Sequence, residues 1–113
     1  PAPKVPTLRD YMAGWLEEFK AAKPRSYVTR KSHVKYWEAS AISGKKIDII
    51  QPAEIRKLMA EQQSAAARNN TVRGRLDTLG MVFRQAMIDG LISKNPLQLI
   101  KRPKLENKAR KNY

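Results

Sequence analysis

The stretch TLRDYMAGWLEEF, residues 7–19, decides the fold class. Its apolar side chains recur at intervals of three and four residues, which is the period of an α-helix with one buried face. These side chains are Leu8, Tyr11, Met12, Trp15, Leu16 and Phe19. Thr7 is suited to cap the first turn, and Pro24 stops the helix. The pattern predicts a helix over residues 8–22 whose aromatic stripe belongs to a hydrophobic core.

A second helix is predicted over residues 26–41, with Ser26 as its N-cap and Ser43-Gly44 after its end. Helical phase turns one apolar set inward, namely Tyr27, Arg30 through its aliphatic stem, Val34, Trp37 and Ala41. The opposite face then carries Arg25, Thr29, Ser32, His33 and Tyr36, which are polar and include no carboxylate.

Two further helices follow. One covers residues 52–63, because Pro52 suits a first helical position, and it buries Ile55, Leu58 and Met59. Residues 64–67 are predicted to form a loop. The last long helix covers residues 70–89, capped within residues 69–71 and closed by Asp89-Gly90. Its buried stripe is Val72, Leu76, Leu79, Phe83 and Ala86, and Asn70, Arg73, Gly74, Asp77 and Met81 face the other way. With a short helix at 96–100, the chain is predicted to form an all-α bundle of four helices.

Composition excludes several classes of function. The chain has 113 residues, no cysteine and one histidine, so a disulfide scaffold, a thiol nucleophile and a zinc site are excluded, and no cofactor is expected. The glycines are scattered singly, so the sequence contains no Gly-rich phosphate loop, and no Ser or Asp spacing around His33 indicates a catalytic triad. No apolar run is long enough to span a bilayer.

The charge points to an anionic partner. There are 23 basic residues against 10 acidic ones, a formal net charge of +13. Nucleic acid is the first candidate partner, an anionic membrane surface the second and an acidic protein the third. Residues 1–6 are expected to be a linker, residues 7–100 the folded domain, and residues 101–113 a basic linker.

The candidate DNA-binding residues lie on the outer face of helix 26–41, in the loop after it and at the start of helix 70–89. Arg and Lys neutralise phosphate, Asn, Ser, Thr and Arg can reach base edges, and a helix N-terminus favours an anion. The predicted set is Arg25, Ser26, Thr29, Ser32, His33, Tyr36, Lys45, Lys46, Arg68, Asn69, Asn70, Thr71 and Arg73.

The order of motifs resembles the core-binding domain of phage-type integrases, the tyrosine recombinases. The matching pieces are TLRDY (7–11), PRSY (24–27), SHV (32–34), GKKI (44–47), IQPAEI (50–55), FRQA (83–86) and DGLISKNPL (89–97). The last of these is the most specific. The chain has Ser26 where the family usually has Thr, and Arg30 where it often has Tyr.

This resemblance implies a SAM-like bundle that grips one side of the DNA core site, with helices 26–41 and 70–89 against the major groove. It also implies that the family's catalytic Arg, Lys, His and Tyr lie in a separate domain after residue 113, so this chain is expected to be non-catalytic and Tyr113 is not the nucleophile. The expected partners are double-stranded DNA, the catalytic domain of the same parent chain and other recombinase protomers, with no membrane, in the cytoplasm of a bacterial or phage-infected cell. The rival interpretation is a basic helical module that docks an acidic protein or a recombinase protomer.

Overall fold

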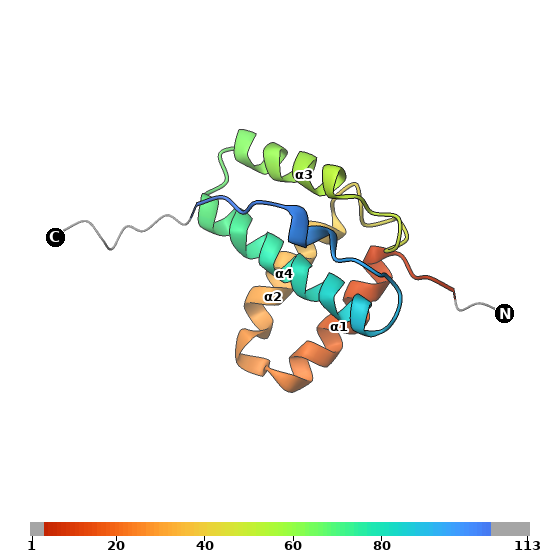
Figure 1. Ribbon diagram of the computed structural model, residues 1–113. Helices are drawn as coiled ribbons and strands as arrows, with labels where there is room; N and C mark the ends of the chain where they lie inside the picture. Colours follow the sequence, from red (N-terminus) through yellow and green to blue (C-terminus); the bar gives the residue numbers. More distant parts are fainter. Residues whose placement is uncertain (1–3, 105–113) are drawn as a thin grey trace.

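The computed structural model describes residues 4–104 of the chain, and over this range it contains helices and no strand (Figure 1). The elements are α1 (Leu8–Ala22), α2 (Pro24–Glu38), α3 (Pro52–Ser64), α4 (Asn69–Ile88) and the short 3-10 helix η1 (Pro96–Leu99). One isolated β-bridge joins Thr7 to Lys46. The predicted all-α bundle of four helices is confirmed, and so is the short helix after Asn95.

The junction of α1 and α2 differs from the prediction at one point. α1 begins as expected, with the Thr7 hydroxyl accepting a hydrogen bond from the Asp10 N–H at 3.2 Å. α2, however, begins at Pro24, and the predicted start at Ser26 is wrong. Proline has a fixed φ and no N–H to satisfy, so it is favoured in a first helical turn. The residue that stops α1 therefore also starts α2, with only Lys23 between the two helices.

The predicted end of α2 at residue 41 is also wrong, because the helix ends at Glu38. The Ser40 hydroxyl donates a hydrogen bond to the Trp37 carbonyl at 2.6 Å, and such side-chain bonds compete with the helical backbone. Ala41, expected on the buried face, lies exposed in the following turn, and Ile42 enters the core instead.

The ends of α3 and α4 are close to their predicted places. At the start of α3, Gln51 and Glu54 form a reciprocal capping box, and the helix runs one residue further than expected. α4 starts with Arg68 in the N-cap position and without a side-chain cap bond, so the predicted capping by residues 69–71 is wrong. The end of α4 is as predicted, because Gly90 adopts a φ of 81° that favours glycine after a helix.

α4 is the central element of the bundle. It contacts α1, α2, α3 and η1, whereas α3 contacts neither α1 nor α2, so α3 lies on the opposite side of α4 from the α1–α2 pair (Figure 1). The predicted stripe of α4 is buried throughout, together with Val82 and Thr78, which the pattern did not assign to the core. The other buried residues of the predicted stripes are Leu8, Met12, Trp15, Val34, Trp37, Ile55 and Leu58. Tyr11, Leu16, Phe19, Tyr27 and Met59 are only partly buried.

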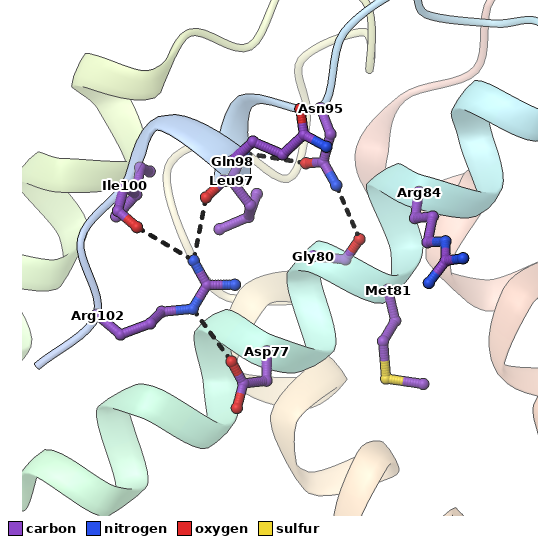
Figure 2. Close-up of a pocket in the computed structure, with 9 residues that line it drawn as sticks. All are labelled: Asp77, Gly80, Met81, Arg84, Asn95, Leu97, Gln98, Ile100 and Arg102. Carbon is purple, nitrogen blue, oxygen red and sulfur yellow. Dashed lines mark hydrogen bonds and ion pairs between the residues drawn. The ribbon is translucent and has the colours of Figure 1, made fainter. Parts of the chain in front are cut away.

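Residues 95–103, called the strap below, run back along α4 in the antiparallel direction (Figure 2). The Asn95 side chain donates to the Gly80 carbonyl at 3.2 Å, and Arg102 Nε donates to Asp77 Oδ1 at 3.1 Å. Arg102 Nη1 also bonds the Leu97 carbonyl at 3.0 Å. The side chain of Arg102 therefore ties the strap both to itself and to α4.

Candidate nucleic-acid interface

An open groove of about 450 Å³ lies between the first half of α2 and the first turns of α4. Its lining residues are Arg25, Ser26, Thr29, Arg30, His33, Asn70 and Gly74, with no carboxylate among them. Five of the seven belong to the predicted DNA-binding set, and they come from two helices that are separate in the sequence. The structure thus gathers part of that set on one surface.

The first turns of both helices border this groove. Arg25 and Ser26 belong to the first turn of α2 and Asn70 to that of α4, and neither turn contains an acidic residue. The N-terminus of a helix carries a partial positive charge and N–H groups without intrahelical partners. The groove therefore combines two helix N-termini with cationic side chains, which favours an anionic ligand.

Gly74 allows the two helices to approach closely. A Cβ at this position would lie 3.2 Å from both Cε1 and Nε2 of His33, tighter than ordinary van der Waals contact. Gly74, predicted to face away from the buried stripe of its helix, packs against the His33 ring of α2. His33 is only partly exposed and faces α4 at the edge of the groove.

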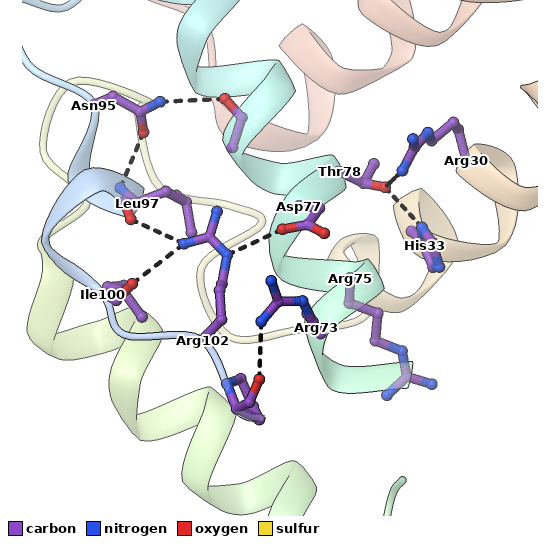
Figure 3. Close-up of polar contacts among 12 residues, drawn as sticks. Arg30, His33, Arg73, Arg75, Asp77, Thr78, Asn95, Leu97, Ile100 and Arg102 are labelled. Carbon is purple, nitrogen blue, oxygen red and sulfur yellow. Dashed lines mark hydrogen bonds and ion pairs between the residues drawn. The ribbon is translucent and has the colours of Figure 1, made fainter. Parts of the chain in front are cut away.

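Thr78, a fully buried residue of α4, joins Arg30 and His33 across the helix interface (Figure 3). Arg30 Nη1 donates to Thr78 Oγ1 at 2.9 Å, and His33 Nδ1 lies 2.7 Å from the same oxygen. Because a guanidinium only donates, the hydroxyl accepts from Arg30 and can give its own proton to His33 Nδ1. In that arrangement His33 is neutral and carries its ring proton on Nε2.

The electrostatics of the interface favour this neutral ring. Burial lowers the pKa of His33 below its ordinary value of 6.5, and the positive charges of Arg30 and Arg75 lower that pKa further. His33 is therefore a hydrogen-bonding group at neutral pH rather than an additional positive charge.

Tyr36 does not lie on the outer face of α2, and that prediction is wrong. Its ring packs edge-on against Trp37, with the ring centroids 4.9 Å apart. The Arg75 guanidinium lies 4.1 Å from the centroid of the Tyr36 ring, and the Trp37 Nε1–H donates to the Arg75 carbonyl at 2.8 Å. The burial of α2 against α4 therefore extends one position further round the helix than the apolar pattern indicates.

The remaining predicted residues do not line the groove. Lys45 forms an ion pair with Glu54, while Lys46 is exposed in the same loop. Arg73, expected to be exposed, is partly buried and donates from Nη1 to the Pro103 carbonyl of the strap at 3.0 Å (Figure 3). Ser32, Arg68 and Thr71 are exposed and Asn69 is partly buried.

Arg30 and Gly74 line the groove but were not in the predicted set, and Thr78 was missed as the hydrogen-bond partner of Arg30. The signal that could have found them is the small-residue pair Gly74 and Thr78, four residues apart and therefore on one face of a helix. Such a face lets a neighbouring helix approach closely.

Other classes of site find no support in the part of the chain that the structure describes. Residues 4–104 contain no group of three or more His, Cys, Asp or Glu side chains that could hold a metal ion. None of the helices described is long and apolar enough to cross a membrane. Tyr113 and most of the predicted linker 101–113 lie outside the described residues, as do residues 1–3.

The bundle has the fold of an integrase-like domain. A solved structure from Bacillus cereus, an integrase-like domain determined by solution NMR, superposes with a TM-score of 0.84. The match covers 100% of this chain and 97% of that one at 12% sequence identity, so it shows that the two share a fold.

Sequence comparison points to the tyrosine recombinases. The chain is 29% identical over 93 residues to a "Tyrosine recombinase XerC-like" protein of Caldanaerobacter subterraneus subsp. tengcongensis. The match covers 80% of this chain and 24% of the relative, so the chain spans about a quarter of the relative's length. No family model matches the chain. The resemblance to integrase-type tyrosine recombinases that the motifs predict is therefore confirmed.

Proposed function

We propose that this chain is the core-binding domain of a tyrosine recombinase and binds duplex DNA through the groove between α2 and α4. The observation that carries the proposal is the convergence of Arg25, Thr29 and Asn70 with two helix N-termini on one surface without carboxylates. Duplex DNA presents phosphates to such a surface and base edges to the side chains around it.

The proposed division of labour follows from the residue types in the groove. Arg25 is exposed at the first turn of α2 and neutralises a phosphate or reads a guanine edge. Ser26, Thr29 and Asn70 donate and accept hydrogen bonds from positions around it. Lys45 and Lys46 add backbone contacts beyond the groove, and strand exchange is carried out by a separate catalytic domain. The proposed binding domain extends the predicted range 7–100 to Pro103, because Arg102 and Pro103 bond α4, and the remainder of the predicted linker leads to the catalytic domain.

Fluorescence anisotropy of a labelled duplex, titrated with the chain at several salt concentrations, tests the proposal. Neutralising about 4–6 phosphates gives a slope of log K against log salt of roughly −4 to −5, with micromolar affinity because only one half of the clamp is present. Arg25→Ala should weaken binding by about 1–3 kcal/mol for a base contact, or reduce the salt slope by about one for a phosphate contact.

Arg56→Ala is the matched control, because Arg56 is exposed on α3, on the far side of α4 from α2. Equal losses from the two variants would show that the wrong surface has been chosen. A flat salt response would favour the rival function, a module that docks a protein partner.

A further inference from the structure

Arg30 lines the groove, and not all N–H groups of its guanidinium have a hydrogen-bond partner among the described residues. Arg30 donates a hydrogen bond from Nη1 to Thr78 Oγ1, while its Nε is buried without a hydrogen-bond partner among the described residues. A buried donor without an acceptor disfavours the structure that contains it, so such groups are rare and call for an explanation. Arg30 also borders the groove, where an external acceptor can reach its side chain.

None of the other residues that line the groove can act as an anionic hydrogen-bond acceptor for the Arg30 guanidinium. The six other lining residues are neutral or cationic, and the residues packed against this part of α2 on α4 include Arg75. Asp77, the nearest carboxylate that acts on His33, is engaged by Arg102. The described residues therefore offer the Arg30 guanidinium no anionic partner, and an anion that enters the groove meets a positive charge that no carboxylate there neutralises.

We propose that Arg30 binds a DNA phosphate at the floor of the α2–α4 groove and that Thr78 is its positioning residue. This inference rests on the proposed function and extends it to a residue that the sequence placed on the inner face. Thr78 Oγ1 holds one end of the guanidinium, at 2.9 Å, and so limits the directions in which the remaining N–H groups can point. Because Thr78 bonds Nη1 and Nε is buried, Nη2 is the guanidinium nitrogen that remains for the phosphate, in a charge-assisted hydrogen bond.

His33 completes the arrangement from the same helix as Arg30. Its Nδ1, 2.7 Å from Thr78 Oγ1, accepts the hydroxyl proton and thereby turns the oxygen lone pairs toward Arg30. Gly74 admits the His33 ring to this position. His33, Gly74 and Thr78 together thus hold the Arg30 side chain in place.

The first test compares Arg30→Met with Arg84→Met by anisotropy on the same duplex. Methionine keeps an unbranched stem between the helices and removes the guanidinium, and Arg84 is an exposed arginine of α4 outside the groove. Arg30→Met should weaken binding about 5–10-fold and reduce the salt slope by about one phosphate, whereas Arg84→Met should leave both within about 2-fold. A loss of affinity at unchanged slope would overturn the phosphate assignment.

The second test examines Thr78 through a double-mutant cycle. Thr78→Val keeps the side-chain shape without the hydroxyl and should weaken binding about 3–5-fold, and Thr78→Ser should restore it. In the Arg30→Met background Thr78→Val should have no further effect on affinity, because the residue that it positions is gone. A general folding defect would lower affinity equally in both backgrounds, and that result would overturn the positioning role.

Arg30→Lys keeps the proposal testable if methionine unfolds the bundle. Lysine retains the charge but lacks the planar fork that offers separate nitrogens to Thr78 and to the phosphate, so affinity should fall to the level of Thr78→Val with the salt slope preserved. Failure of this inference and of the proposed function are distinguishable. Wild-type protein that binds DNA through Arg25 but is unaffected by changes at Arg30 would overturn only this inference, whereas wild-type protein without DNA affinity would overturn both.

Discussion

The Tyr11 hydroxyl donates a hydrogen bond to Asp89 Oδ2 at 2.5 Å and so joins the first helix to the residue that ends the fourth. These residues are 78 positions apart in the chain. The Gln85 side chain, one turn earlier on α4, donates to the other carboxylate oxygen of Asp89 at 3.2 Å, so both carboxylate oxygens accept a hydrogen bond.

Tyr11→Phe should lower the free energy of unfolding by about 1 kcal/mol, because a hydrogen bond to a charged but exposed carboxylate is lost and no cavity forms. Urea unfolding followed by circular dichroism measures the change. Tyr27→Phe is the matched control, since the Tyr27 ring lies beside the ammonium groups of Lys20 and Lys31 rather than a carboxylate. An equal change in both variants would contradict a specific role for the bond to Asp89.

His33 should make stability depend on pH in the acid range. Burial, with help from Arg30 and Arg75, lowers the pKa of His33 in the folded state, so the unfolded chain binds this proton more tightly. The stabilising contribution is then complete above pH 6.5 and is lost as pH falls from 6.5 through the lower pKa of the folded protein. His33 is the only histidine in the chain, so NMR titration of its ring follows the effect directly. A pKa at or above 6.5 in the folded protein would contradict the prediction, and His33→Gln should remove this part of the pH dependence.

Phe83→Ala should lower the free energy of unfolding by about 3–5 kcal/mol, because the side chain has no exposed surface and its removal leaves a cavity beside the other core residues of α4. Leu16→Ala provides the comparison. Leu16 is only partly buried at the edge of the same core, so its truncation should cost clearly less. Thermal and urea unfolding measure both, and a loss below about 1 kcal/mol at Phe83 would mean that α4 buries a different face.

Arg102→Met should loosen the strap more than Asp77→Asn does. The Asp77 side chain is half exposed, so its ion pair with Arg102 contributes at most about 0.5 kcal/mol. The bonds from Arg102 to the carbonyls of Leu97 and Ile100 are lost only when the arginine itself is removed, at a cost of about 1–2 kcal/mol. Hydrogen exchange at the Ile100 N–H, which bonds the Leu97 carbonyl, reports the opening of the strap. Faster exchange in Asp77→Asn than in Arg102→Met would reverse this assignment.

Much of the fold can be predicted from the spacing of apolar residues and from the prolines and glycines that mark helix boundaries. The stripes of α1 and α4 fall inside the bundle because burial of one face is what an amphipathic helix requires. The predicted bounds of α2 were wrong by two or three residues for local reasons. Pro24 acts as the first helical residue, and the Ser40 hydroxyl donates to the Trp37 carbonyl in the last turn of the helix. Neither effect is visible in the spacing of apolar residues.

The candidate site was predictable on its exposed side and not on its buried side. Arg25, Thr29 and Asn70 carry polar groups at positions that helical phase turns outward, and they do line one groove. The floor of that groove depends on a polar core residue, Thr78, and on the absence of a side chain at Gly74. Polar contacts between helices depend on how the helices cross, which a single sequence does not specify. The same reason explains why the position of Tyr36 was misassigned.

The strap has a geometric consequence for whatever the chain is joined to. Its hydrogen bonds with Gly80, Asp77 and Arg73 follow α4 from its middle back toward its start, so Pro103 is bonded to Arg73, which precedes the groove residue Gly74 in α4. A chain that leaves the bundle there starts from a fixed point beside the proposed DNA surface. A domain joined to the chain after this point would be attached close to the bound duplex. The distance that its linker must span would then be measured from the first turns of α4.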